Sequence, residues 1–363
     1  MLPVPARSGG PAVVSAQELY YPAAGGAEQS IHALLRGLND RGYRCTALTR
    51  ADRGRPAAEI IDGVQVRRCD PIGLETMLTD QITALRPVAA LTQQAWSGRV
   101  VEVCHALGVP SICFARNTAD VASGAVSGRR SATAVVASSP YLAGVIRARC
   151  GLDPTVIAPP IDIGRYRVRP AGDLITMINP VKVKGGAVFR DIARALPSRR
   201  FLAVKGWDSL RSPDGAGWDL RTLAASGVGL PVSIDLSGLA NVDQLEPVTD
   251  MRAIYARTRI LLVPSLWDEA FGRVAAEAMC SGIPVIASAR GNLPDTVGTG
   301  GIIITDPLDI ASWTTAVAIL DNPAAYHHFS RQARRSARRY RIGAITTALI
   351  RLLDQISDGV TVG

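Results

Sequence analysis

Short runs of apolar residues recur along the first half of the chain, and most are followed by a stretch in which apolar residues are spaced as in a helix. Helical spacing is clearest at Ile31, Leu35 and Leu38, and Gly42 then supplies a residue that can end a helix. Alternation of buried strands with helices predicts an α/β domain built on a parallel sheet. The predicted strands of this half are residues 11–16, 43–48, 64–68, 88–91, 111–114 and 134–137.

The same alternation starts again after residues 163–172, which contain Arg, Gly and Pro and are predicted to be a linker. Residues 207–230, rich in charge and glycine, are predicted to leave the second domain as an excursion. A chain of 363 residues is long enough for two cores. We therefore expect one domain over residues 1–168 and a second over residues 169–335. The predicted strands of the second half are residues 174–178, 201–204, 260–263, 285–287 and 302–304.

The stretch 264–284, P-S-L-W-D-E-A-F-G-R-V-A-A-E-A-M-C-S-G-I-P, lies between two of these strands and holds two separated glutamates. Glu269 falls in a loop, and Glu277 falls on the helix that follows Gly272. A loop after a parallel strand lies at the carboxyl end of the sheet, where open α/β folds bind ligands. Glycine has no Cβ, so the backbone at Gly272 can approach a ligand closely.

The helix of this stretch begins at Arg273 and Val274, whose free backbone amides would attract a phosphate group. Two carboxylates touching a diphosphate would repel it, so we expect Glu269 and Glu277 to accept hydrogen bonds from neutral hydroxyls on either side of it. A ligand with hydroxyls, a diphosphate and further hydroxyls is a nucleotide-sugar. The alternative is that both acids lie on the surface and that Gly272 is an ordinary turn residue.

Together with Phe271, these residues resemble the E-x7-E signature of the retaining GT-B glycosyltransferases of family 4, also called glycosyl transferases group 1. The match continues through P-S-L-W-x-E-x-F-G before the helix and G-I-P-V-I-A-S after it, and residues 290–295 resemble the family's Gly-Gly-x-P-E turn. The resemblance implies an α/β fold of two Rossmann-like domains facing across a cleft, with the acceptor mostly on the first and the donor mostly on the second. It also implies that the last helix, within residues 336–363, returns to the N-terminal domain.

The loop N-P-V-K-V-K-G-G at residues 179–186 resembles the family's strand, loop, Lys-Gly, helix unit. The resemblance assigns Lys184 to the diphosphate, where its compact charge would bind phosphate oxygens. The family usually has an arginine five residues before this lysine, whereas this chain has Asn179, which donates hydrogen bonds but carries no charge. Lys182 or Arg273 would then have to supply the missing charge. The alternative for Lys184 is a solvated lysine at the start of a helix.

In the N-terminal half, Gly25 and Gly26 stand between a strand and a helix, which resembles the family's loop facing the cleft. Many family members also place a histidine after one of the N-terminal strands. Here the corresponding stretches are T-Q-Q at residues 92–94 and A-R-N at residues 115–117. We assign Arg116 as the replacement for that histidine on the acceptor side.

The resemblance implies an enzyme of the hexosyltransferase type that moves a sugar from a nucleotide-sugar, with a UDP-sugar favoured, to an acceptor hydroxyl with retention of configuration. By analogy Glu269 holds the donor-sugar hydroxyls and acts with Lys184 and Arg116, and Glu277 holds the ribose. The acceptor is then a small molecule, a glycan or a lipid-linked group. A sugar-nucleotide epimerase or pseudo-glycosyltransferase on the same fold is the alternative, since the usual arginine and histidine are missing. A nonenzymatic protein that binds anions or nucleic acid is a further alternative, but it would leave the E-x7-E stretch unexplained.

Composition adds expectations about cofactors and location. The sequence has no D-x-D and no cluster of His, Asp and Cys with ligand spacing, so we expect no metal and no other cofactor. His32 is predicted to lie at the surface of the first helix, with a position lining the cleft as the alternative. The six cysteines form no C-x-x-C pair, and no apolar run is long enough to span a bilayer. We therefore expect reduced thiols and a cytoplasmic protein.

The net charge of +9 permits an anionic partner, and five arginines near the C-terminus fall on one helical face. The functional interpretation of this arginine stripe is peripheral contact with an acidic membrane surface or partner. The alternative is a solvated face or ion pairs to the first domain, where the resemblance places the last helices. No nucleic-acid partner is expected. The arginine stripe consists of Arg331, Arg334, Arg335, Arg338 and Arg339.

Overall fold

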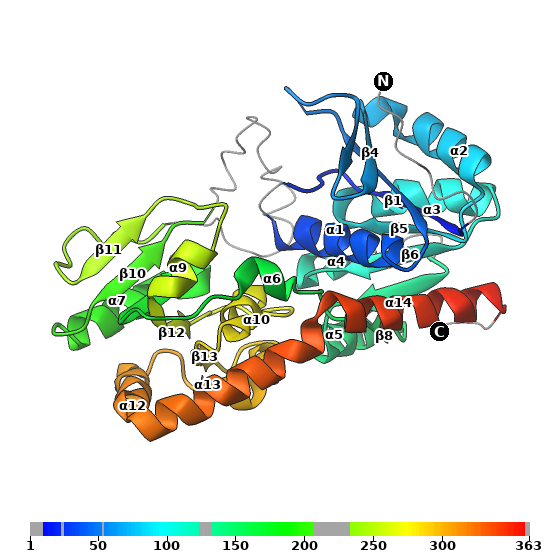
Figure 1. Ribbon diagram of the computed structural model, residues 1–363. Coiled ribbons are helices and arrows are strands. Elements are labelled where there is room, and N and C mark those ends of the chain that lie inside the picture. Colours follow the sequence, from blue (N-terminus) through cyan, green and yellow to red (C-terminus); the bar gives the residue numbers. More distant parts are fainter. Residues whose placement is uncertain are drawn as a thin grey trace. The chain divides into compact units, whose positions relative to one another are not determined.

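The computed structural model describes residues 10–22, 25–52, 54–122, 126, 132–206 and 233–359. They fall into two compact units, each built on one sheet (Figure 1). The first unit comprises Met1–Pro160 with Ile342–Gly363, and the second comprises Ile161–Arg341. The predicted excursion at 207–230 lies outside the described residues.

The border between the units falls earlier than the predicted border after residue 168, because the predicted linker begins with structure of the second unit. Ile163–Tyr166 form the short helix α6, and Tyr166 is buried. Ser281 joins both sides of this segment, since its hydroxyl donates to the Tyr166 carbonyl at 2.8 Å and accepts from the Val168 amide at 2.9 Å. The C-terminal border likewise follows Arg341 rather than residue 335.

The sheet of the first unit has eight strands in the order β3-β4-β2-β1-β5-β6-β7-β8, parallel except for β3 against β4. The six predicted strands are present at nearly the same residues, and the short edge strands β3 and β8 were not predicted. The strands are β1 (Ala12–Ala16), β2 (Arg44–Arg50), β3 (Ala58–Ile61), β4 (Val64–Cys69), β5 (Ala89–Gln93), β6 (Ser111–Ala115), β7 (Ala134–Ala137) and β8 (Thr155–Val156).

Helices cover both faces of this sheet, because successive residues of a strand point to opposite sides. Val13 packs with Leu35 of α1 and Leu349 of α14, whereas Val14 packs with Leu78 of α2 and Val100 of α3. Each fully buried aliphatic side chain of this kind contributes about 1.5–3 kcal/mol. The helices are α1 (Gly26–Asn39), α2 (Leu74–Leu85), α3 (Ser97–Ala106), α4 (Thr118–Ala122), α5 (Pro140–Cys150) and α14 (Ile342–Ser357). The last helix thus belongs to the N-terminal unit through its apolar face.

The sheet of the second unit has six parallel strands in the order β11-β10-β9-β12-β13-β14. The strands are β9 (Leu174–Ile178), β10 (Phe201–Val204), β11 (Val242–Leu245), β12 (Thr258–Val263), β13 (Val285–Ser288) and β14 (Gly301–Ile304). Outside these strands, Ser233 forms an isolated bridge with Val181. The edge strand was missed because Asp243 and Gln244 are exposed and interrupt its apolar pattern.

Helices α7 and α12 cover one face of the second sheet, where Phe189 and Trp313 join a common core. On the other side α10 packs against α13 and α11. The helical elements are η3 (Lys182–Lys184), α7 (Gly186–Ala195), α9 (Arg252–Arg257), α10 (Arg273–Cys280), α11 (Leu293–Val297), η4 (Gly298–Gly300), α12 (Ile310–Asp321), α13 (Pro323–Ala337) and η5 (Arg338–Tyr340).

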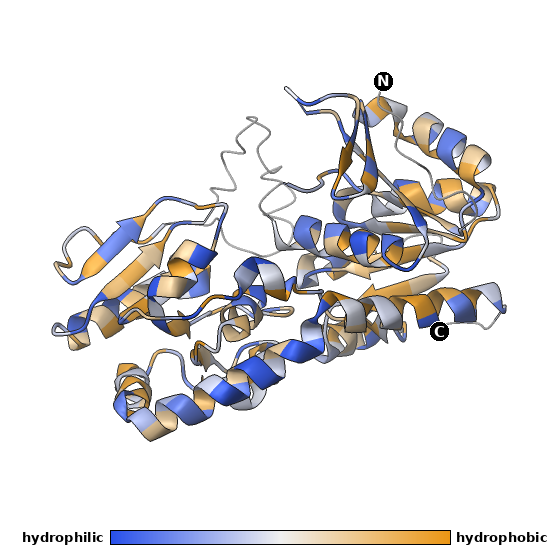
Figure 2. Ribbon diagram, in the orientation of Figure 1, coloured by the Kyte–Doolittle hydropathy of each residue, from blue (hydrophilic) through white to orange (hydrophobic). Residues whose placement is uncertain are grey.

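The arginine stripe lies on α13 and η5, in a helix that Figure 2 shows as mainly hydrophilic. Two of its members are bound within the second unit itself. Arg334 donates to the Ser281 carbonyl at 3.1 Å, and Arg339 donates to the Thr296 carbonyl at 3.1 Å. All five arginines remain exposed. The stripe is therefore a solvated face in which two arginines also donate hydrogen bonds within the second unit. Contact with a membrane surface stays a prediction. No helix among the described residues is long and apolar enough to cross a membrane.

Candidate active site

Lys184 and Glu269 form an ion pair at the carboxyl edge of the second sheet. Lys184 ends η3 after strand β9, and Glu269 lies in the loop after the neighbouring strand β12. The ammonium Nζ lies 2.6 Å from Glu269 Oε1 and 4.6 Å from the centre of the Trp267 ring. Ser265 donates to the same carboxylate oxygen at 2.6 Å. The pair is thus held by a cation–π contact and a second hydrogen bond.

Glu269 is 8% exposed, and its charge is controlled by its partners. Burial would raise the pKa of its carboxyl, but the charge and hydrogen bond of Lys184, with the hydroxyl of Ser265, outweigh burial and hold the pKa below its ordinary value. The carboxylate is therefore ionised at neutral pH. An ionised carboxylate accepts hydrogen bonds from sugar hydroxyls.

Two glycines fix the backbone around this pair. Gly185 has φ +83°, and a Cβ there would lie 1.8 Å from the carbonyl oxygen of Pro264. Gly291 has φ +56°, and a Cβ there would lie 2.3 Å from the carbonyl oxygen of Glu269. Only glycine combines this left-handed backbone with such close approach. The η3 loop and the 290–292 turn therefore both pack directly on the loop that carries Glu269.

The start of α10 follows Glu269 closely. Gly272 has φ +83° and caps the helix without a side-chain hydrogen bond, so no capping side chain occupies the first amides of α10. Free amides at a helix start favour a phosphate. Phe271 is 6% exposed and packs edge-to-face on Tyr340 at 4.9 Å, so its side chain has a packing contact and its donor contact stays a prediction.

Glu277 lies deeper, in a buried polar group of its own. Its Oε1 accepts from Arg273 Nε at 2.7 Å, and its Oε2 accepts from the Tyr255 hydroxyl at 3.2 Å. Arg273 also donates to the Tyr166 hydroxyl at 3.4 Å. Burial raises the pKa of Glu277, opposed by the charge of Arg273 and the hydroxyls of both tyrosines. The guanidinium of Arg273 is thus bound by Glu277, so it does not replace the charge that an arginine at position 179 would supply.

The backbone conformation at position 179 favours asparagine over the arginine that is usual in the family. It adopts φ +59°, a left-handed conformation that asparagine tolerates better than most residues. Its amide donates to the Val204 carbonyl at 2.7 Å, and its side chain lies against Gly206, where a Cβ would lie 2.4 Å from the Asn179 amide carbon. Lys182, the other proposed source of charge, is exposed.

In the first unit, the predicted Gly25–Gly26 loop leads into α1 at the carboxyl edge of the sheet. A Cβ on Gly25 would lie 1.8 Å from Glu28 Oε2, so this glycine lets the Glu28 side chain fold back over the start of its own helix. Glu28 is 2% exposed. Burial raises the pKa of its carboxyl, against a hydrogen bond with Gln94 and the charge of Arg116. Sequence reasoning missed Glu28, although it stands only two residues after the glycine pair.

Arg116, the predicted replacement for the family histidine, directly follows β6. Its Nε donates to Gln93 Oε1 at 2.8 Å, and its guanidinium lies 4.7 Å from the centre of the Phe114 ring. Its backbone amide donates to Asp120 Oδ2 at 2.7 Å. Burial raises the pKa of Asp120 to about 6 despite these amide contacts and the nearby guanidinium. Arg116 therefore has a polar environment, and its catalytic role stays a prediction.

The prediction that His32 lies at the surface is wrong. The ring is 2% exposed and stacks on Tyr21 at 4.2 Å. Its Nδ1 shares a hydrogen bond with the Tyr20 hydroxyl at 2.8 Å, and its Nε2 lies 3.1 Å from Asp62 Oδ2. Its neighbours come from two loops distant in sequence, which the helical position of His32 alone did not reveal.

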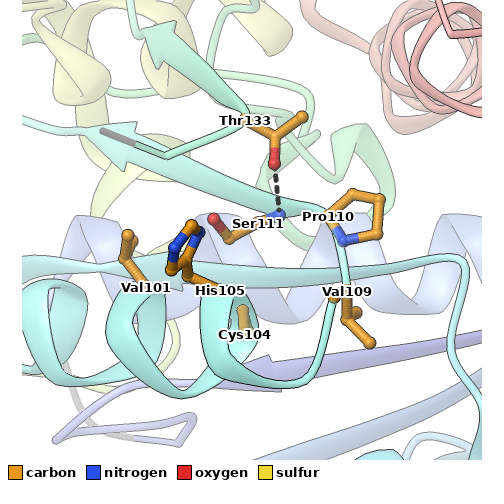
Figure 3. Close-up of a pocket in the computed structure, with 8 residues that line it drawn as sticks. Val101, Cys104, His105, Val109, Pro110, Ser111 and Thr133 are labelled. Carbon is orange, nitrogen blue, oxygen red and sulfur yellow. Dashed lines mark hydrogen bonds between the residues drawn. The ribbon is translucent and has the colours of Figure 1, made fainter. Parts of the chain in front are cut away.

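A pocket of about 240 Å³ lies between α3 and the start of β6 (Figure 3). Its lining includes His105 and Cys104, and Thr133 Oγ1 accepts from the Ser111 amide at 3.0 Å. Burial raises the pKa of Cys104 to about 12, so this thiol is not reactive at neutral pH. The pocket lies at the amino end of β6, on the opposite edge from Arg116, and does not belong to the candidate site.

Across the part of the chain that the structure describes, no group of three or more His, Cys, Asp or Glu residues is placed to hold a metal ion. All six cysteines are unpaired, and only Cys150 is not buried. Metal independence stays a prediction.

Comparison with known proteins assigns a family to each half of the chain. The model described as Glycosyltransferase Family 4 matches residues 24–165, and the model described as Glycosyl transferases group 1 matches residues 235–336. D-inositol 3-phosphate glycosyltransferase of Corynebacterium kroppenstedtii is 37% identical over 116 residues, which cover 28% of this chain and 25% of that protein. The enzyme of the same name from Thermomonospora curvata is 25% identical over 93% of this chain and 92% of that protein. Four of the curated relatives are matched over only 25–30% of their own length.

Solved structures match over nearly the whole chain. Sucrose-phosphate synthase from Thermosynechococcus elongatus has a TM-score of 0.73 at 20% identity, covering 96% of this chain and 100% of that one. Anabaena HepE in complex with UDP-glucose has a TM-score of 0.73 at 16% identity, covering 95% and 99%. At these identities the likeness shows the fold, which is the predicted α/β arrangement of two parallel-sheet domains. With both family models matched on this fold, the chain belongs to the GT-B glycosyltransferases of family 4 and group 1.

Proposed function

We propose that this glycosyltransferase moves a hexose from a UDP-sugar to an acceptor hydroxyl with retention of anomeric configuration. The observation that carries the proposal is the Lys184–Glu269 ion pair, next to the start of α10, which no side chain caps. This edge offers positive charge and amide donors for a diphosphate and a carboxylate for sugar hydroxyls. Those are the groups that a nucleotide-sugar needs, in the order in which it presents them.

Lys184 has a defined role in this proposal. Its ammonium would exchange the carboxylate of Glu269 for the diphosphate oxygens, and the α10 amides would add hydrogen bonds to the same anion. Negative charge on the leaving diphosphate grows as the glycosidic bond breaks, so preorganised donors stabilise the transition state more than the ground state. Once Lys184 binds the diphosphate, Glu269 could accept hydrogen bonds from the hydroxyls of the donor sugar.

Glu277 would bind the ribose of the nucleotide. Its carboxylate is hydrogen-bonded by Arg273, Tyr255 and Tyr166, and a carboxylate offers about four acceptor positions. A ribose hydroxyl could therefore bind without breaking the buried ion pair. The ribose contact changes little between the bound donor and the transition state. It would therefore contribute to donor binding and not to the rate of the chemical step.

The choice of UDP is supported by solved relatives, and retention by the resemblance to the retaining family-4 enzymes. HepE of Anabaena was solved with UDP, with UDP and glucose, and with UDP-glucose. The curated relatives carry the name D-inositol 3-phosphate glycosyltransferase. The transition state would be oxocarbenium-like, as in glycoside hydrolysis. Attack on the face from which the diphosphate leaves would retain configuration without a nucleophilic carboxylate.

The test is a turnover assay with UDP-glucose and a panel of acceptors, in the presence of EDTA. We expect UDP release that depends on acceptor, and product NMR that shows the anomeric configuration of the donor. Sugar-nucleotide conversion without any acceptor would instead indicate an epimerase. A product of inverted configuration, or full loss of turnover in EDTA restored by Mg²⁺ or Mn²⁺, would contradict the corresponding part of the proposal.

A further inference from the structure

Adjacent strand ends of the first sheet bring together polar side chains that are distant in sequence. Gln17 directly follows β1, Gln93 ends β5, and Ser138 directly follows β7. These strands belong to the consecutive order β1-β5-β6-β7. Glu28 of α1 joins them through its hydrogen bond with Gln94. We call Gln17, Glu28, Gln93 and Ser138 the polar row.

Every member of the polar row is buried and has one polar atom for which the described part of the chain supplies no hydrogen-bond partner. The exposed fractions are 0% for both glutamines and 2% for Glu28 and Ser138. The atoms are Gln17 Nε2, Glu28 Oε1, Gln93 Nε2 and Ser138 Oγ. Buried polar atoms in folded proteins are nearly all hydrogen-bonded. Four such atoms at one sheet edge indicate a polar ligand.

The orientation of the glutamine amides is set by their neighbours. Arg116 Nε donates to Gln93 Oε1 at 2.8 Å, and a guanidinium can only donate, so Gln93 Nε2 must point away from it. Gln17 Oε1 accepts from Ser15 Oγ at 2.7 Å, which leaves the Gln17 amide hydrogens for another acceptor. The polar row thus offers two amide donors, a carboxylate acceptor and a hydroxyl. Groups that both donate and accept, such as neighbouring hydroxyls, match this mixture.

The charges at this edge disfavour an anion. Arg116 lies within the electrostatic reach of two carboxylates, Glu28 and Asp120. Farther along the edge, Arg50 is paired with Glu18 at 3.1 Å. Arg116 Nη2 is a further buried donor at this edge, but the carboxylates of Glu28 and Asp120 already oppose its charge. A phosphate entering the polar row would therefore meet more negative than positive charge among these groups.

On the basis of the proposed function, we propose that the polar row binds the acceptor, and that this acceptor is an uncharged polyol or sugar rather than a phosphorylated one. The glutamine amides and the Ser138 hydroxyl bind its hydroxyls, and Glu28 accepts from one of them. Glu28 also determines specificity, because its charge repels a phosphate.

The test uses pairs of probes that differ only in a phosphate. With UDP present, the protein is titrated with myo-inositol against D-inositol 3-phosphate and with glucose against glucose 6-phosphate, followed by ligand-observed NMR. We expect the uncharged member of at least one pair to bind at least about tenfold more tightly, equivalent to about 1.4 kcal/mol. Equal or tighter binding of the phosphorylated member in both pairs, or no binding of any probe, would overturn the proposal.

Variants locate the binding. Gln17→Leu and Ser138→Ala should each weaken binding of the uncharged probe by about three- to tenfold, as expected for one lost neutral hydrogen bond. Glu28→Gln should reduce the preference over the phosphorylated probe. The control is Gln65→Leu on β4, an exposed glutamine of the same unit, which should change neither affinity. Unchanged affinities in both Gln17→Leu and Ser138→Ala, with intact unfolding temperatures, would place the ligand elsewhere.

The outcomes separate this proposal from the proposed function. If the sugar of UDP-glucose is transferred to another acceptor of the panel but no uncharged probe binds, the acceptor proposal fails and the transferase proposal stands. If the probes bind as expected but no nucleotide-sugar binds or is consumed, the polar row stands as a polyol site and the transferase proposal fails.

Discussion

The carboxyl edges of the two sheets differ in how their polar groups are satisfied. In the second sheet charges pair with each other, Lys184 with Glu269 at 2.6 Å and Arg273 with Glu277 at 2.7 Å. In the first sheet the polar row consists mostly of neutral groups with unpartnered atoms. An unpaired buried charge is far more costly than an unpaired amide or hydroxyl. A site that keeps charges for a diphosphate must therefore pair them internally, while a site for hydroxyls can leave its groups open.

The largest expected effect comes from breaking the Arg273–Glu277 pair at the carboxyl edge of the second sheet. Glu277→Gln leaves the buried guanidinium of Arg273 without its counter-charge, so it should lower the free energy of unfolding by about 3–5 kcal/mol, measured by urea denaturation. The matched control is Glu246→Gln, which breaks an exposed pair with Lys205 and should cost at most about 1 kcal/mol. Similar losses in both variants would show that burial does not distinguish the two pairs.

Glu269→Gln should act on the chemical step. The sugar gains positive charge as the diphosphate leaves, and a nearby carboxylate then binds it more strongly. We expect kcat to fall about tenfold to a thousandfold, or about 1.4–4 kcal/mol, in steady-state kinetics with donor varied. Asp268→Asn changes the exposed neighbouring acid and should leave kcat unaltered. If Glu269→Gln changes only the KM for donor while folded Glu277→Gln loses kcat, the assignment of sugar and ribose sides is reversed.

Lys184→Ala should weaken binding of UDP by about 1.5–3 kcal/mol, the range for a hydrogen bond to a charged group, and should affect uridine far less. Calorimetry with both ligands measures this difference. Lys182→Ala is the control, because Lys182 is exposed on the same turn. Equal losses for UDP and uridine would remove Lys184 from the diphosphate site.

The smallest expected effect compares the pH dependence of the two edges. Lys184 and Ser265 hold the pKa of Glu269 below its ordinary value, so the stability that Glu269 contributes is present above that value and is lost as the pH falls through its lower folded pKa. Burial raises the pKa of Glu28, so its ionised form lowers stability at neutral pH, and stability is regained as the pH falls through its folded pKa. At neutral pH, Glu269→Gln should therefore have a lower Tm than the unmodified protein, and Glu28→Gln a higher Tm. Both differences should become smaller as the pH is lowered. If Glu28→Gln instead had a lower Tm than the unmodified protein at neutral pH, the conclusion that ionised Glu28 lowers stability would be wrong.

The sequence was sufficient for much of the second edge. The strand, loop and helix order around residues 264–284 predicted a ligand loop at a sheet edge, and Glu269 and Lys184 both lie there. Their direct pairing was not predicted, because it depends on β9 and β12 being neighbours in the sheet. Nothing local in the sequence specifies that order.

The first edge was mostly hidden for the same reason. Gln17, Gln93 and Ser138 each look like an ordinary polar residue at the end of a strand, and only the order β1-β5-β6-β7 makes them a group. His32 was misjudged because its partners Tyr20 and Asp62 come from loops on either side of β2. Periodicity locates strands and helices, but it does not say which strand ends meet.

The glycines at 185 and 291 have a consequence for how the enzyme can change over evolution. Neither carries a side chain that could touch a substrate, yet each allows a backbone contact that would be impossible with a Cβ. A library of random substitutions scored for activity should therefore find these two positions as intolerant as the acids they surround. Variation in sugar or acceptor preference has to arise elsewhere, on side chains that can change without moving this backbone.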